Sequence, residues 1–188
     1  MSIEEIRDWI KNNFRDDNPF DWFDCKEFEN KIVPIIPEEL KIIELPPTEK
    51  KYNCYVFAFG LRDDEDFTNR SNGLFIDGDD IKKLIDSGIL VETKSQKEKD
   101  YIIYSEKGKI NHVGIVRKEG IVISKWSDGP IIEHQTLAVN PAYGTDIAYY
   151  KKINPEEIKK AFENKKRKGL SETIDRINEI KNRQNDQP

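Results

Sequence analysis

The stretch Tyr52–Gly60 constrains the fold more than any other part of the sequence. Between Asn53 and Gly60 it carries one cysteine and otherwise only apolar or aromatic residues. Asparagine is a residue type that caps helix N-termini, and glycine commonly ends a helix. We therefore predict a short buried helix that begins at Cys54 and stops near Gly60.

The position of Cys54 at the start of this helix affects the reactivity of its thiol. A cysteine there meets unpaired backbone N–H groups and the positive end of the helix dipole, which lower the pKa of its thiol. The same N–H groups can hold the oxyanion that forms when a thiolate attacks a carbonyl. Cys54 is thus a candidate nucleophile, and the alternative is a small buried residue of an apolar helix.

A histidine occurs at the start of a predicted strand. His112 is one of two histidines in the chain and lies in the run Asn111–Val116, which a turn connects to a second apolar run, Ile121–Trp126. A cysteine on a helix and a histidine on a later strand are what thiol catalysis requires. The imidazole takes the thiol proton and later donates a proton to the leaving group. His112 is therefore the candidate base; its alternative role is structural.

The overall composition excludes several classes of protein. The net charge of −5 over 188 residues gives no reason to expect a nucleic-acid partner. We find neither a membrane-spanning apolar run nor a signal peptide, so we expect no membrane partner and a cytoplasmic location, although an effector exported without a cleaved signal would look the same. Cys25 and Cys54 form neither a disulfide framework nor a metal-ligand spacing. Acidic neighbours make Cys25 the poorer nucleophile.

Taken together, these motifs resemble the papain-like NlpC/P60 and CHAP cysteine hydrolases, in which a cysteine opens a helix packed on an antiparallel sheet and a histidine begins the next core strand. The chain is also similar to a bacterial group related to that superfamily. Residues 50–152 carry this resemblance, and Ser127 stands where that group usually has glycine. The matching motifs are Asn53–Cys54, His112–Gly114, Ser124–Trp126, His134 and Tyr143–Gly144.

The resemblance implies a catalytic site with Cys54 as the nucleophile and His112 as the base. Ser124 or His134 would orient His112. Ser124 fits the NlpC/P60 spacing of twelve residues after the histidine, whereas His134 matches the bacterial group and is the better partner for an imidazolium. The remaining candidates, which would bind the oxyanion or the substrate, are Asn53, Tyr52, Lys125 and Trp126.

The register between the predicted strands Asn111–Val116 and Ile121–Trp126 determines which polar side chains lie near His112. Pairing of Val116 with Ile121 across the turn would place Ser124 and Lys125 opposite His112. The alternative is structural: a cross-strand surface pair of Lys125 with Glu133, and a core position for Trp126.

We expect an α+β fold of the papain-like NlpC/P60 type, with an antiparallel sheet of about five strands packed on the Cys54 helix and helical additions at both termini. Residues 1–48 would form a helical and extended segment packed on the core. Residues 49–152 would form the catalytic core. Residues 153–188 would form a helical extension with a disordered tail, whose narrow apolar stripe favours docking onto the domain or self-association.

Local signals predict the other elements. Ser2 and Glu5 form a capping box for a first helix over residues 1–14. Prolines punctuate residues 33–47, which predicts an extended segment, and residues 61–78 are polar enough for a solvated loop or the wall of a substrate cleft. The remaining predictions are helices over 21–31 and 79–87, strands over 101–104, 131–135 and 147–150, and helices that begin after Asn154 and at Ser171.

The sequence thus predicts a cysteine-dependent hydrolase or acyl transferase that acts on an amide bond through a thioester, with neither a metal nor an organic cofactor. Its substrate would be a peptide or another amide-containing molecule; peptidoglycan peptide, protein side-chain amide and lipid ester all stay open. The alternative is a catalytically inactive papain-like protein of the binding or immunity type, which Ser127 and the weak orienter Ser124 favour.

Overall fold

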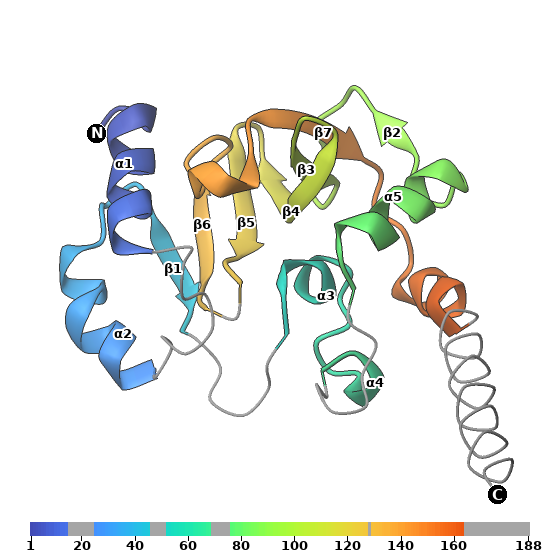
Figure 1. Cartoon of the computed structure of the whole chain (residues 1–188), viewed down its shortest axis with the longest axis horizontal. Helices are drawn as coiled ribbons and strands as arrows, with labels where there is room; N and C mark the ends of the chain where they lie inside the picture. The colour runs from blue at the N-terminus through green and yellow to red at the C-terminus, as the bar shows by residue number, and fades with distance from the viewer. Residues whose placement is uncertain (15–24, 46–51, 69–75, 128, 164–188) are drawn as a thin grey trace, which may run out of the picture. The chain divides into compact units, whose positions relative to one another are not determined.

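An antiparallel sheet organises the part of the chain that the computed structural model describes, namely residues 1–14, 25–45, 52–68, 76–127 and 129–163. The chain divides into two compact units, Met1–Ile153 and Asn154–Pro188. The first unit contains the whole described sheet together with several helices (Figure 1). None of the described helices is long and apolar enough to cross a membrane.

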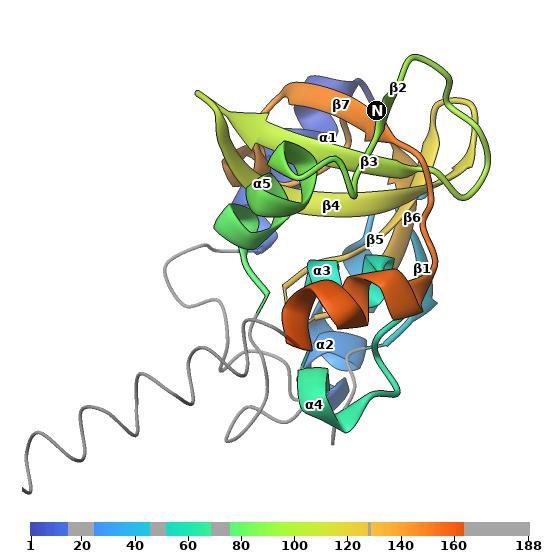
Figure 2. The same cartoon turned by 90° about the vertical axis from the view of Figure 1, so that its right-hand side faces the viewer.

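The described sheet has seven strands in the order β1-β6-β5-β4-β3-β7-β2. All of its pairs are antiparallel, and Figure 2 shows β7, β3 and β4 side by side. The predicted α+β class is therefore confirmed, whereas the sheet has more strands than the expected five. The strands are β1 (Lys41–Glu44), β2 (Glu92–Thr93), β3 (Tyr101–Glu106), β4 (Lys109–Lys118), β5 (Ile121–Lys125), β6 (Ile131–Gln135) and β7 (Asp146–Tyr150).

Each unit contains short helices. In the second unit, a helix over residues 155–163 begins after Asn154, whose side-chain oxygen accepts a hydrogen bond from the Glu156 N–H at 3.0 Å. The predicted helix start at Ser171 lies outside the described residues, as do residues 21–24 of the predicted second helix. The helices of the first unit are α1 (Ile3–Asn13), α2 (Cys25–Lys31), η1 (Val33–Ile35), α3 (Cys54–Ala58), α4 (Glu65–Thr68), α5 (Gly78–Asp86) and η2 (Pro141–Tyr143).

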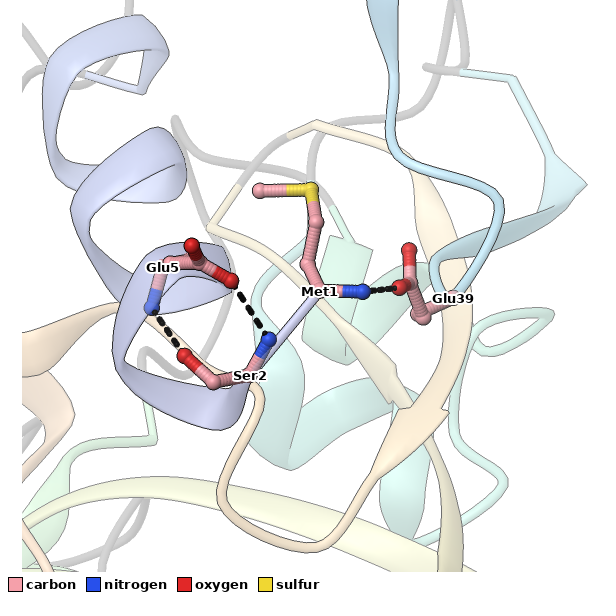
Figure 3. A network of polar contacts seen from close by, with 4 residues as sticks. All are labelled: Met1, Ser2, Glu5 and Glu39. Atoms are coloured by element: carbon pink, nitrogen blue, oxygen red, sulfur yellow. Dashed lines mark hydrogen bonds and ion pairs between the residues drawn. The ribbon is translucent and has the colours of Figure 1, made fainter.

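The start of α1 follows the predicted capping box. The Ser2 hydroxyl accepts from the Glu5 N–H at 3.2 Å, and the Glu5 carboxylate accepts from the Ser2 N–H at 2.7 Å (Figure 3). The Met1 amino group also pairs with Glu39, in the turn before β1. These contacts hold the first turn of α1, whose buried residues Ile6 and Ile10 pack in one apolar cluster with residues of the sheet.

Strand register divides the side chains of the sheet between two faces. Tyr104 of β3 pairs with His112 of β4, so both point to one face, which η2 covers through Tyr143. Side chains an odd number of residues away on the same strand point to the other face, as do those of Tyr101 on β3 and Val113 on β4. The aromatic ring of Phe59, which follows α3, meets Tyr101 edge-on at 5.2 Å, so α3 packs on that second face.

Two segments differ from their predicted structure. Within the expected extended segment, residues 33–35 form η1 instead, whereas Lys41–Glu44 are extended as predicted and pair with β6 as an edge strand. Within the expected loop, α4 forms because Phe67 is buried and anchors one helical turn. The predicted helix over 79–87 is confirmed as α5.

Candidate active site

Asn53 sets the start of α3. Its side-chain oxygen accepts from the Val56 N–H at 3.2 Å, and its side-chain N–H₂ donates to the Ile76 carbonyl at 2.8 Å. Gly60 follows the helix with a φ of 71°. The helix predicted from this stretch is therefore confirmed, with Cys54 as its first residue. Asn53, a candidate oxyanion donor, uses both ends of its amide to cap and anchor α3.

The Cys54 thiol lies in a buried, polar environment. Burial raises the pKa of the thiol to about 12, while the backbone N–H groups of Val113, Tyr55 and Cys54 and the Lys125 ammonium lower that pKa by less. The expected lowering by the helix dipole is therefore outweighed, because Cys54 is only 6% exposed. The thiol is neutral at pH 7, with three N–H groups around it.

The imidazole of His112 is buried. Its residue is 0% exposed, and neither ring nitrogen has a partner among the described residues. The ring stacks on Tyr143, with centroids 3.9 Å apart and planes inclined by 6°, and Tyr104 lies 5.5 Å away. Burial, and then the proximity of His134, hold the pKa of His112 well below its ordinary value.

Ser124 and His134 bond to each other rather than to His112. The Gln135 carbonyl, 2.7 Å from Nδ1 of His134, can only accept, so we assign the ring proton to Nδ1. Nε2 then accepts from the Ser124 hydroxyl at 2.8 Å. The Ser124 oxygen in turn accepts from the Trp126 indole N–H at 3.0 Å. Neither predicted orienter therefore reaches His112.

The register predicted between β4 and β5 is wrong by one residue. Val116 pairs with Val122, and a bulge precedes the pair of Lys118 with Ile121. The bulge adds a residue to one strand, which the turn sequence does not reveal. Continued along the strands, this register sets His112 opposite Trp126 instead of the predicted Ser124 and Lys125.

Lys125 is a buried residue rather than a surface one. It is 0% exposed, and its Nζ donates to the Gly129 carbonyl at 2.5 Å and lies 4.6 Å from the centre of the Tyr52 ring. The alternative of a surface pair with Glu133 is wrong, because Lys125 faces Ile131 across the strands. The predicted core position of Trp126 is confirmed, since Trp126 is 3% exposed.

The predicted site residues thus form two groups. No hydrogen bond joins the thiol to an imidazole, because the His112 nitrogens have no described partner and those of His134 bond elsewhere. The Val113 N–H, which faces the sulfur, belongs to the residue directly after His112 and links the groups. The first group contains Tyr52, Asn53, Cys54 and Lys125, and the second contains His112, Ser124, Trp126 and His134.

Comparison with known proteins places most of this unit in one family. A family model described as a domain of unknown function, DUF7689, matches residues 44–151, more than half of the chain. The chain belongs to the DUF7689 family. The match runs from the end of β1 to the residue after β7, so every predicted site residue lies inside the DUF7689 domain. Searches of curated proteins and of solved structures give no match.

Two backbone positions of the DUF7689 domain explain motif residues that the sequence left without a role. Ser127 has a φ of 53°, in the left-handed region that glycine adopts most easily. Gly144 has a φ of 92°, and a Cβ there would lie 2.1 Å from the Ser105 carbonyl oxygen. Gly144 therefore allows the chain after Tyr143 to approach β3.

Substitution of Gly144 by alanine should be costly. We expect Gly144→Ala to lower the free energy of unfolding by about 1–3 kcal/mol, because it adds a steric contact to an unfavourable backbone conformation. Urea denaturation measures the change. Gly120→Ala is the matched control, since Gly120 has a φ of 74° and no atom of the described residues lies within 4 Å of the added Cβ. An equal loss in both variants would contradict the close approach at Gly144.

The ring of Tyr143 covers His112, a contact that the sequence does not predict. An aromatic residue next to a glycine does not reveal what it contacts. Among the described residues, no three His, Cys, Asp or Glu side chains gather closely enough to hold a metal ion.

Proposed function

We propose that this DUF7689 protein is a cysteine-dependent hydrolase or acyl transferase that acts on an amide bond of a peptide or another amide-containing substrate. The environment of the Cys54 sulfur carries the proposal. The N–H groups of Cys54, Tyr55 and Val113 converge on this one atom. Convergent backbone N–H groups stabilise negative charge, either on a thiolate or on the oxyanion of an attacked carbonyl.

His112 is the second support. A buried polar group without a hydrogen bond costs about 1–3 kcal/mol, and such a group in a folded protein calls for an explanation. Among the described residues, the imidazole of His112 is such a group. The next residue, Val113, supplies one of the N–H groups that face the Cys54 sulfur. The lowered pKa of His112 keeps the ring neutral at pH 7, which is the form that accepts a proton.

In the proposed reaction, the Cys54 sulfur attacks the carbonyl carbon while its proton passes to a ring nitrogen of His112. Proton loss accompanies the attack, because the thiol is neutral at pH 7. The imidazolium then protonates the leaving amine, and the thioester is released by water in a hydrolase or by a second amine in a transferase. His112 lies on the face of the sheet that η2 covers, and α3 packs on the other face, so a rearrangement on substrate binding must bring the thiol and a ring nitrogen within hydrogen-bond reach.

A catalytically inactive papain-like protein, of the binding or immunity type, is the second candidate. The burial of Cys54 favours it, and so does the stacking of His112 with no hydrogen-bond partner among the residues that the structure describes. In such a protein the thiol would be a core group, and the convergent N–H groups would serve only to satisfy the polar atoms at the start of α3.

Labelling with iodoacetamide separates the two candidates without knowledge of the substrate. At pH 7 we expect Cys54 to be alkylated faster than Cys25, and His112→Ala to slow the alkylation of Cys54 at least about tenfold, since the base is lost. Peptide mapping by mass spectrometry gives both rates, and Cys54→Ala confirms the assignment. If Cys54 reacts no faster than Cys25 and His112→Ala changes nothing, the enzyme proposal fails.

A further inference from the structure

Lys125 and Cys54 share one face of the sheet. Val122 of β5 belongs to the apolar cluster that packs against Tyr143 of η2. Alternate residues of a strand point to opposite faces, so Lys125, three positions later, points to the face on which α3 packs. The helix α3 also contacts β5 itself. Lys125 therefore lies on the side of the sheet that carries the thiol, whereas His112 lies on the other side.

The strand register also brings Lys125 beside the N–H groups around the sulfur. Continued past its last pair, the register of β4 and β5 sets Lys125 opposite Val113, whose N–H is one of the three that face Cys54. The Lys125 Nζ lies 4.6 Å from the centre of the ring of Tyr52, two residues before Cys54. Burial raises the pKa of the Cys54 thiol most, and the N–H groups and the Lys125 ammonium oppose that rise.

We propose that Lys125 is the cationic partner of Cys54, a buried ammonium that stabilises the thiolate. The inference rests on the proposed function, in which Cys54 is the nucleophile, and extends it. A nearby positive charge favours a thiolate over a thiol, and it does so most strongly where water is excluded. Lys125 is 0% exposed, so little solvent screens its charge. Lys125 keeps its own protons, and the thiol proton passes to the base of the proposed reaction.

The turn after β5 and an aromatic ring hold the ammonium in place. The Lys125 Nζ donates to the Gly129 carbonyl at 2.5 Å. The Gly129 N–H donates to the Trp126 carbonyl at 2.8 Å, and the Trp126 N–H donates to the Pro130 carbonyl at 3.0 Å, so the acceptor of the ammonium belongs to a closed turn. The face of the Tyr52 ring attracts the cation from another direction.

Tyr52 and Tyr55 are titratable neighbours of this pair. Burial, more than any charge, raises the pKa of both phenols, and the Tyr55 hydroxyl donates to the Ile110 carbonyl at 3.4 Å. Because an ordinary phenol titrates near pH 10, both tyrosines stay neutral from pH 7 to pH 9. The reactivity of Cys54 in that range therefore depends on the charge of Lys125 and not on that of either tyrosine.

The rates at which Cys54 reacts with a neutral and with an anionic alkylating reagent test this role. Lys125→Met removes the charge, and we expect Cys54 to react with iodoacetamide at least about tenfold more slowly from pH 7 to pH 9, because its pKa rises further. The reaction with iodoacetate should slow by about a further threefold or more, since this anion also loses the attraction of the ammonium. Lys125→Arg keeps the charge, and we expect its ratio of the two rates to match the wild type within about twofold.

Lys118→Met is the matched control, because it removes the same charge from an exposed position of the neighbouring strand β4. We expect both of its rates to match the wild type within about twofold, as a distant exposed charge is screened. Peptide mapping by mass spectrometry gives the rates at Cys54, and thermal unfolding checks that each variant is folded. Where Lys125→Met does not fold, Lys125→Gln keeps a donor for the Gly129 carbonyl without the charge.

The outcomes separate this inference from the proposed function. If Cys54 reacts faster than Cys25 in the wild type while Lys125→Met behaves like Lys118→Met, the inference is overturned and the proposed function stands. An equal change with both reagents would indicate altered access to the thiol rather than a lost charge, and would also overturn the inference. If Cys54 reacts no faster than Cys25 and His112→Ala changes nothing, the proposed function fails and the inference fails with it.

Discussion

Acidification from pH 7 to pH 4 should weaken the folded protein strongly. Burial lowers the pKa of His134 to about 4, against a weaker opposing hydrogen bond to Gln135, and burial and His134 lower that of His112 further. Unfolded imidazoles titrate near pH 6.5, so below that pH the unfolded chain binds more protons than the folded one. The contribution of the two neutral, buried imidazoles to the free energy of unfolding is fully present above pH 6.5. His134 alone should remove roughly 3 kcal/mol of it by pH 4.

Urea denaturation at several pH values between 7 and 5 measures this effect. The measurements stop at pH 5 because the pKa values of Glu5 and Glu39 are also lowered. Protonation of these carboxylates at more acid pH would lower the stability of the protein for a second reason. His134→Gln is the control, since a glutamine amide can still accept from Ser124 but does not titrate. We expect a shallower pH dependence in that variant. Equal stability of the wild type at pH 6.5 and pH 5 would contradict the prediction.

Replacement of His112 by phenylalanine should stabilise the protein while it removes the proposed base. An apolar ring keeps the stack on Tyr143 and no longer buries two nitrogens that have no hydrogen-bond partner in the described part of the chain. We expect the free energy of unfolding at pH 7 to rise by about 1–3 kcal/mol, the usual cost of a buried unsatisfied polar group. Urea denaturation gives the stability, and iodoacetamide labelling gives the loss of assistance to Cys54.

His134→Phe is the matched control, because it removes an imidazole of the same face whose nitrogens are both bonded. That variant breaks two buried hydrogen bonds, and we expect it to lower the free energy of unfolding by about 1–3 kcal/mol. Opposite signs for the two substitutions would mark His112 as a residue kept for function at a cost in stability. A loss of similar size in both would show that His112 is structural.

Much of the fold could be predicted because its signals are local. The capping box of Ser2 and Glu5, the Asn53 cap and the strands around His112 each depend on residues a few positions apart. Such signals act through hydrogen bonds within one turn or alternation within one strand. They therefore identify the elements that carry the candidate site.

The arrangement of the site could not be predicted, because it depends on how deeply each side chain is buried and on the register between β4 and β5. The helix dipole at Cys54 is a local property, but the burial that outweighs it arises from packing on the sheet. The bulge before Lys118 shifts the register of β4 and β5, and so changes which residues face His112. Lys125 is a charged residue in a 0% exposed position, which no rule of composition anticipates.

The order of strands in the sheet also separates early from late steps of folding. Neighbours from β3 to β6 are joined by short turns, so this meander closes only small loops. The edge strand β1 pairs Lys41 with Glu133, 92 residues away, and α3 precedes the strands on which it packs. Because distant contacts form slowly, Cys54 should stay open to oxidants until α3 docks. The newly made chain therefore exposes a thiol that the finished fold buries.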